Sequence, residues 1–136
     1  MYLSPKGMKI FSQEIQYFLS QNIKSVDYLR ILLFLKENSD QTWTVYNIGK
    51  KLHLHHTSVK DILKFLTKRG FLKIESQEKE LFYSYKPRNE DLDSMVEQLA
   101  QIDQHYPVSL INFIYSLSKS PIQSFADAFK LKSEEE

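Results

Sequence analysis

Apolar residues recur along most of the chain at steps of three and four, the spacing that places side chains on one face of a helix. This spacing predicts helices over residues 8–19, 25–38, 45–52, 57–68, 90–106 and 108–117, and a last short helix over 121–131. Segments 71–75 and 81–85 are instead rich in strand-favouring residues, and the polar stretch 76–80 between them predicts a hairpin. The pattern therefore predicts a mainly α-helical chain with one small β-hairpin.

Residues that commonly begin or end helices stand at several of these boundaries. Ser25, Thr44 and Asn89 are placed to act as N-caps, and Pro107 fits the first turn of a helix. Gly70 follows the helix over 57–68, where a chain often ends a helix in the left-handed conformation that glycine adopts most easily. A short extended piece is expected around residue 43.

The order of elements in the middle of the chain predicts a winged helix-turn-helix with additional N- and C-terminal helices. A short helix and a tight turn precede a longer helix with lysines on its polar side, and the hairpin follows directly. Apolar residues of the first helix and the turn can pack against Val59, Ile62 and Leu63, which leaves the other face of the second helix free to enter a major groove. We expect a helical extension over 1–24, the DNA-binding domain over 25–87, dimerising helices over 88–132 and a frayed tail over 133–136.

The segment IGKKLHLHHTSVKDILKFLTKRGFLKI, residues 48–74, resembles bacterial winged-helix regulators of the MarR-like and ArsR-like kind. Their usual pattern is a short helix ending in Leu, a turn residue, an apolar residue, a small polar cap, a polar-starting helix and a closing Gly–hydrophobic–Leu. The chain departs from it twice, because His53 stands where glycine is usual and His55 where Ser or Thr is usual. Residues 83–132, which include SLINFIYS and FADAFKLK, also resemble small bacterial winged-helix regulators.

The resemblance implies which residues face double-stranded DNA. It places the early polar residues of the second helix in the groove, where side chains reach base edges and phosphates. Gln77 and Lys79 would contact the minor groove or the flanking backbone from the hairpin tip, although Glu78 and Glu80 beside them oppose this. On the helix and its cap the DNA-binding candidates are His55, His56, Thr57, Ser58, Lys60, Asp61, Lys64 and Lys68.

The net charge of +1 hides an uneven distribution that agrees with this hypothesis. Residues 43–75 contain seven Lys or Arg against two acids, and residues 76–103 contain three against seven. A clustered basic region is the electrostatic footprint of a nucleic-acid-binding element. The acids at the start of the helix over 90–106 are explained as first-turn charges that complement the helix dipole.

Other functional classes find little support in the sequence. The chain has no cysteine and only three glycines, which excludes thiolate chemistry and a glycine-rich phosphate loop. No nucleophile, base and orienting group stand at an interpretable spacing, so we expect no enzyme and no cofactor. The N-terminus lacks the pattern of a secretory signal, and no apolar run approaches membrane-spanning length, so we expect a cytoplasmic protein.

Several alternatives remain beside the DNA-binding hypothesis. The close histidines at 53, 55 and 56 suggest a metal site, but their side chains are expected to diverge, and we interpret them as a turn and a cap; a response to pH stays open. Aromatic residues from Tyr83 to Phe129 could line a ligand pocket, although a core or a homodimer interface is the commoner use. The main rival is a winged helix that binds another protein.

Overall fold

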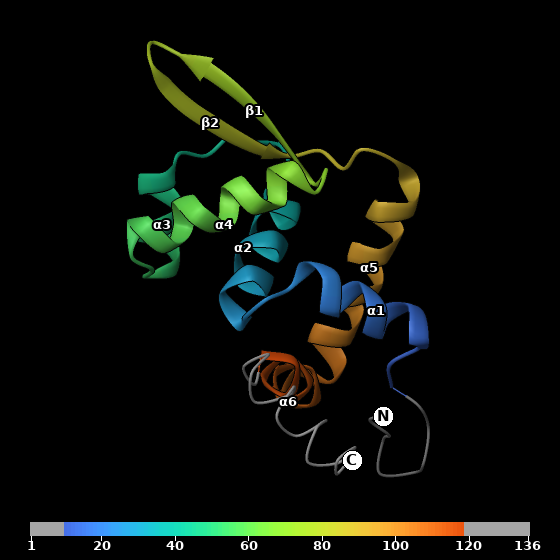
Figure 1. The fold of residues 1–136 in the computed structure, drawn as a ribbon. Helices are drawn as coiled ribbons and strands as arrows, with labels where there is room; N and C mark the ends of the chain where they lie inside the picture. Colours follow the sequence, from blue (N-terminus) through green and yellow to red (C-terminus); the bar gives the residue numbers. More distant parts are fainter. Residues whose placement is uncertain (1–9, 119–136) are drawn as a thin grey trace, which may run out of the picture.

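The computed structural model describes residues 10–118, which form six helices and one two-stranded antiparallel sheet (Figure 1). The predicted mainly α-helical fold with one hairpin is confirmed. The predicted helix over 121–131 and the tail lie outside the described residues. In chain order the elements are α1 (Gln13–Asn22), α2 (Val26–Glu37), α3 (Val45–Leu52), α4 (His56–Lys68), β1 (Leu72–Gln77), β2 (Glu80–Tyr85), α5 (Glu90–His105) and α6 (Pro107–Ser118).

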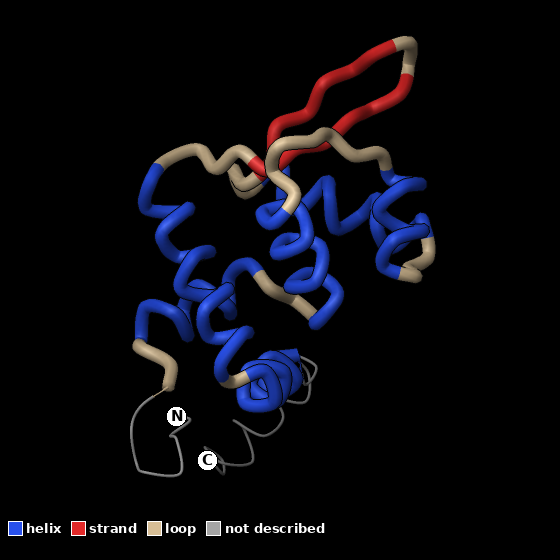
Figure 2. The backbone as a smooth tube through the Cα atoms, turned by 180° about the vertical axis from the view of Figure 1, so that it is seen from behind, coloured by secondary structure: helices blue, strands red, loops and turns tan. Residues whose placement is uncertain are grey.

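The hairpin of β1 and β2 projects from one end of the helical body, and α6 lies at the other end (Figure 1). Helix α4 runs beneath the base of the hairpin and packs against α3 and α2. Seen from behind, the hairpin stands clear of the helices over most of its length (Figure 2). The hairpin tip and the exposed side of α4 are therefore both accessible to a partner.

One apolar core joins all six helices. As predicted, Ile48 of α3 is buried together with Val59, Ile62 and Leu63 of α4. The terminal helices belong to the same core, because α1 adds Ile15, Phe18 and Leu19, and α5 and α6 add Val96, Leu99, Leu110 and Ile114. The helix-turn-helix is thus held on a body to which both terminal parts of the described chain contribute.

The predicted caps occur at two of the three positions. Thr44 Oγ1 accepts a hydrogen bond from Asn47 N at 3.1 Å, and Asn89 Oδ1 accepts one from Leu92 N at 2.9 Å. Ser25 precedes α2 but makes no side-chain cap bond. Gly70 follows α4 with a φ of 92°, the left-handed conformation predicted for it.

The predicted bounds of the first helix were wrong at both ends. Helix α1 begins at Gln13 rather than at residue 8, because Ser12 Oγ accepts a hydrogen bond from Ile15 N at 3.1 Å and caps it there. It continues to Asn22. The Asn22 side chain is buried, donating to Phe18 O at 3.0 Å and accepting from Arg69 Nε at 2.9 Å, and this long-range contact was not visible in the apolar pattern.

The hairpin is longer than predicted, and its turn is shorter. The strands pair as far as Gln77 with Glu80, so the turn contains only Glu78 and Lys79, with φ of 49° and 70°. Positive φ at both positions defines the type I′ turn that matches strand twist. The polar residues suggested a loop, but backbone pairing in an exposed arm requires no apolar side chains. The predicted extended piece at Trp43 is confirmed by an isolated bridge to Tyr83.

None of the helices within residues 10–118 is both long and apolar enough to span a membrane.

Candidate nucleic-acid interface

The turn between α3 and α4 brings the two helices into close contact. Leu54 N donates to Gly49 O at 2.9 Å, and a Cβ on Gly49 would lie only 2.9 Å from Leu54 O. His53, the first residue after α3, has φ 58° and ψ 48°, the left-handed conformation that glycine adopts in the resembling pattern. The chain therefore makes the expected turn with a less suitable residue, and only glycine fits at position 49.

His55 is the N-cap of α4, although it replaces the usual Ser or Thr. Its Nδ1 accepts a hydrogen bond from Thr57 N at 3.2 Å, so the ring supplies an acceptor to a free backbone N–H of the first turn. The rings of His55 and His56 are stacked, with centroids 5.1 Å apart. The expectation that these side chains diverge was wrong for this pair. Within residues 10–118, no three His, Cys, Asp or Glu side chains are grouped to hold a metal ion.

The exposed side of α4 contains every residue of this helix that was predicted to face DNA. Val59, Ile62, Leu63 and Leu66 form the buried stripe of this helix. Because the helical period puts the remaining positions on the other side, that side presents polar and basic groups to solvent. Its exposed members are His56, Thr57, Ser58, Lys60, Asp61, Lys64 and Lys68.

A cleft between α4, the start of α3 and the hairpin brings three predicted residues together. His56 and Lys60 line it from α4, and Lys79 lines it from the turn of the hairpin. Its volume is about 450 Å³, and Tyr46 and Leu81 supply exposed apolar surface to its walls. Lys60 and Lys79 on opposite walls favour a negatively charged chain between α4 and the hairpin, although Glu80 also lines the cleft.

Other predicted residues lie outside this cleft. Lys64 and Lys68 follow along α4, and Gln77 pairs with Glu80 inside the hairpin rather than in its turn. Asp61 lies on the side of α4 nearer to α2: burial and the charge of Asp61 both raise the pKa of Tyr28 there. Asp61 is therefore less suited than Lys60 to a contact in the cleft.

The basic residues of this surface are not neutralised by the protein. Lys73 is paired with Glu75 at 3.2 Å on β1. Elsewhere between residues 43 and 85, the structure contains no ion pair. The unpaired, exposed lysines of α3, α4 and the hairpin turn are Lys50, Lys51, Lys60, Lys64, Lys68 and Lys79.

Sequence reasoning missed two residues of this surface, Tyr46 and Lys50 on α3. The Tyr46 side chain is 66% exposed, and Lys50 Nζ lies 5.7 Å from its ring centroid. Both residues line a second, smaller hollow with Gly49, Leu54 and His56. Their spacing of four residues on the polar face of α3 was the available signal, since it places both next to the turn.

The arrangement is similar to solved structures of bacterial winged-helix regulators. A mutant of MepR from S. aureus superposes with a TM-score of 0.52 at 15% identity, covering 91% of this chain and 88% of that chain. BpsR of Bordetella bronchiseptica gives 0.51 at 15% identity, covering 89% and 85%. A double mutant of ZitR from Lactococcus lactis, in its apo form, gives 0.50 at 18% identity, covering 95% and 98%. The chain thus has the winged helix-turn-helix fold of these regulators.

The sequence matches no protein-family model and no curated protein.

Proposed function

We propose that this protein is a sequence-specific regulator of transcription that binds double-stranded DNA by inserting α4 into a major groove. The observation that carries the proposal is the exposed face of α4, where Lys60 and Lys64 lie one turn apart without ion-pair partners. Each lysine that neutralises a phosphate releases a bound counterion and so favours association. In this proposal the protein acts in the bacterial cytoplasm and catalyses no reaction.

Individual residues receive distinct roles in this proposal. His56, Thr57, Ser58, Lys60, Asp61 and Lys64 face the groove, where a side chain can reach a base edge or a phosphate. His55 fixes the start of α4, whose free N–H groups favour a phosphate. The sugar-phosphate backbone of the DNA that flanks this groove is contacted by Lys68, Gln77 and Lys79. BpsR, which has this fold, is described as a protein whose DNA binding is regulated by 6-hydroxynicotinic acid.

We propose further that the protein acts as a homodimer through its C-terminal helices. Val108 of α6 is 69% exposed, although α6 is apolar on nearly all sides. An exposed apolar helix face favours association with a second copy. Two-fold symmetry would place two α4 helices in successive major grooves, about 34 Å apart.

The test is binding to a generic duplex over a range of salt concentrations. Affinity should fall steeply with salt, and Lys60→Ala combined with Lys64→Ala should lower the slope of log K against log salt by about 1.8, or 0.9 for each lost phosphate contact. Lys24→Ala is the matched control. Lys24 is an exposed lysine just before α2, and its ammonium lies over the Phe65 ring rather than among the lysines on the exposed side of α4. Absence of duplex binding at low salt would contradict the proposal and favour the rival role as a protein-binding module.

A further inference from the structure

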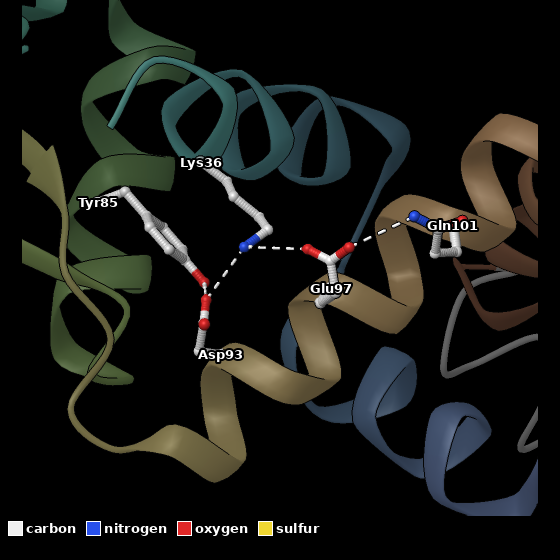
Figure 3. Close-up of polar contacts among 5 residues, drawn as sticks. All are labelled: Lys36, Tyr85, Asp93, Glu97 and Gln101. Carbon is white, nitrogen blue, oxygen red and sulfur yellow. Dashed lines mark hydrogen bonds and ion pairs between the residues drawn. The ribbon is translucent and has the colours of Figure 1, made fainter. Parts of the chain in front are cut away.

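A polar cluster joins the base of the hairpin to helices α2 and α5 (Figure 3). The Tyr85 hydroxyl donates to Asp93 Oδ1 at 2.5 Å, and Lys36 Nζ donates to the same oxygen at 3.1 Å. Lys36 also pairs with Glu97 Oε1 at 3.4 Å. We refer to Lys36, Tyr85, Asp93 and Glu97 as the Tyr85 cluster, which connects α2 to β2 and α5, two consecutive elements much later in the chain.

The cluster favours one arrangement of protons and charges. The Lys36 side chain is only 20% exposed, and its ammonium lies 5.1 Å from the centroid of the Tyr85 ring. Burial, the hydrogen bond to Asp93 and the nearby carboxylates raise the pKa of Tyr85. The hydrogen bonds from Tyr85 and Lys36 lower the pKa of Asp93. Tyr85 therefore stays a neutral donor and Asp93 an ionised acceptor, the pairing that makes hydrogen bonds short and strong.

Tyr85 lies at the base of the hairpin. It is the last residue of β2 and pairs with Leu72, the first residue of β1. The following link is fixed by Lys86 N to Phe71 O at 2.9 Å and by Arg88 N to Gly70 O at 2.7 Å. The strand from Tyr85 to Glu80 spans about 17 Å at 3.4 Å per residue, so a small rotation at the base becomes a larger displacement of Lys79 at the turn.

We propose that the Tyr85 cluster sets the angle between the hairpin and α4. This angle decides whether Lys79 reaches the duplex whose major groove α4 enters. Asp93 and Glu97 lie on α5, so the position of α5 is communicated to the hairpin through these contacts. Tyr85 is a positioning residue, because it acts on DNA only through Lys79. The inference rests on the proposed function.

The test is the variant Tyr85→Phe, which removes the hydroxyl and keeps the ring. Duplex affinity should fall about threefold to tenfold, and the salt slope should fall by about 0.9, the share of one phosphate contact. Lys79→Ala should show the same two changes. Because both variants lose the same contact, Tyr85→Phe combined with Lys79→Ala should bind no more weakly than Lys79→Ala alone.

Two carboxylates of α5 provide a matched pair of control substitutions. Asp93→Asn weakens the acceptor of the Tyr85 hydroxyl and should behave like Tyr85→Phe. Asp91→Asn makes the same chemical change in the first turn of α5, at an exposed residue outside the cluster, and should bind like the parent protein. Equal losses from both variants would overturn the inference, since they would point to the charge of α5 rather than to the hairpin.

A measurement without DNA separates this inference from the proposed function. In the free protein, Tyr85→Phe should accelerate amide hydrogen exchange in the hairpin and leave α4 unchanged. Unchanged exchange, unchanged affinity, or additive losses in the double variant would each overturn the role of the cluster. If the parent protein fails to bind duplexes, the proposed function is wrong, and faster exchange confined to the hairpin would still support control of its angle.

Discussion

Lysines are used in opposite ways on two sides of this molecule. On the side formed by α3, α4 and the hairpin turn, exposed lysines such as Lys60 and Lys64 have no ion-pair partner. On the side where α2 meets α5, Lys36 is largely buried between Asp93 and Glu97. A cation already paired within the fold stabilises that fold and is not available to a phosphate. The comparison therefore separates lysines that hold the protein together from those that are free to bind a partner.

The largest expected effect comes from reversing charge on the unpaired side. Lys60→Glu combined with Lys64→Glu should weaken duplex binding about 100-fold or more, because two phosphate contacts are lost and two repulsions are added. The free energy of unfolding should change by no more than about 0.5 kcal/mol, as for other exposed positions. Affinity by fluorescence anisotropy and stability by urea unfolding check both parts. A loss of stability as large as the loss of binding free energy would show that these lysines also hold the fold together, which contradicts the comparison.

Removing the paired lysine should give the opposite result in stability. Lys36→Met keeps the length of the side chain but leaves Asp93 and Glu97, one helical turn apart, as uncompensated like charges. Both carboxylates are about half exposed, so solvent screening limits the expected loss to about 1 kcal/mol. Urea unfolding measures it, with Lys60→Met as the matched control, for which no comparable loss is expected.

The same cluster predicts a pH dependence of stability. The pKa of Tyr85 is raised above 10.0, so the folded chain keeps a proton that the unfolded chain loses, and stability should fall as the pH rises above about 10. The pKa of Asp93 is lowered below 3.8, so its contribution is present above about pH 4 and is lost as the pH falls further. Urea unfolding from pH 8 to 11 should show a shallower decline in Tyr85→Phe. Some decline remains, because burial also raises the pKa of Tyr28 and Tyr83.

The smallest effect concerns the turn on the unpaired side. His53→Gly removes the left-handed strain of a residue with a Cβ and should raise the free energy of unfolding by about 0.5 kcal/mol. Duplex affinity should stay at the parent value, because the helix positions are unchanged. Gly49→Ala should instead lower the free energy of unfolding, because the added Cβ would lie too close to the backbone oxygen of Leu54. A gain in stability from both changes would show that backbone conformation does not limit this turn.

Much of the fold was predictable because it depends on local rules. The stripe of Val59, Ile62, Leu63 and Leu66 made α4 visible, and Gly70 marked its end. Thr44 and Asn89 act as caps with backbone N–H groups three residues away. The exposed lysines of α4 follow from the same period, since their positions lie outside the buried stripe.

What the sequence by itself determined about this protein is the order of elements, the buried face of each main helix and the concentration of positive charge around α4. Only the tertiary structure decided that Lys79 lies across a cleft from His56 and Lys60. It also decided that α1 extends to a buried Asn22, and that Lys36 forms ion pairs with Asp93 and Glu97. Helical period and capping act over a few residues and are written in the chain. Contacts between Lys36 and Asp93, 57 residues apart, exist only once the core has set the distance between their helices.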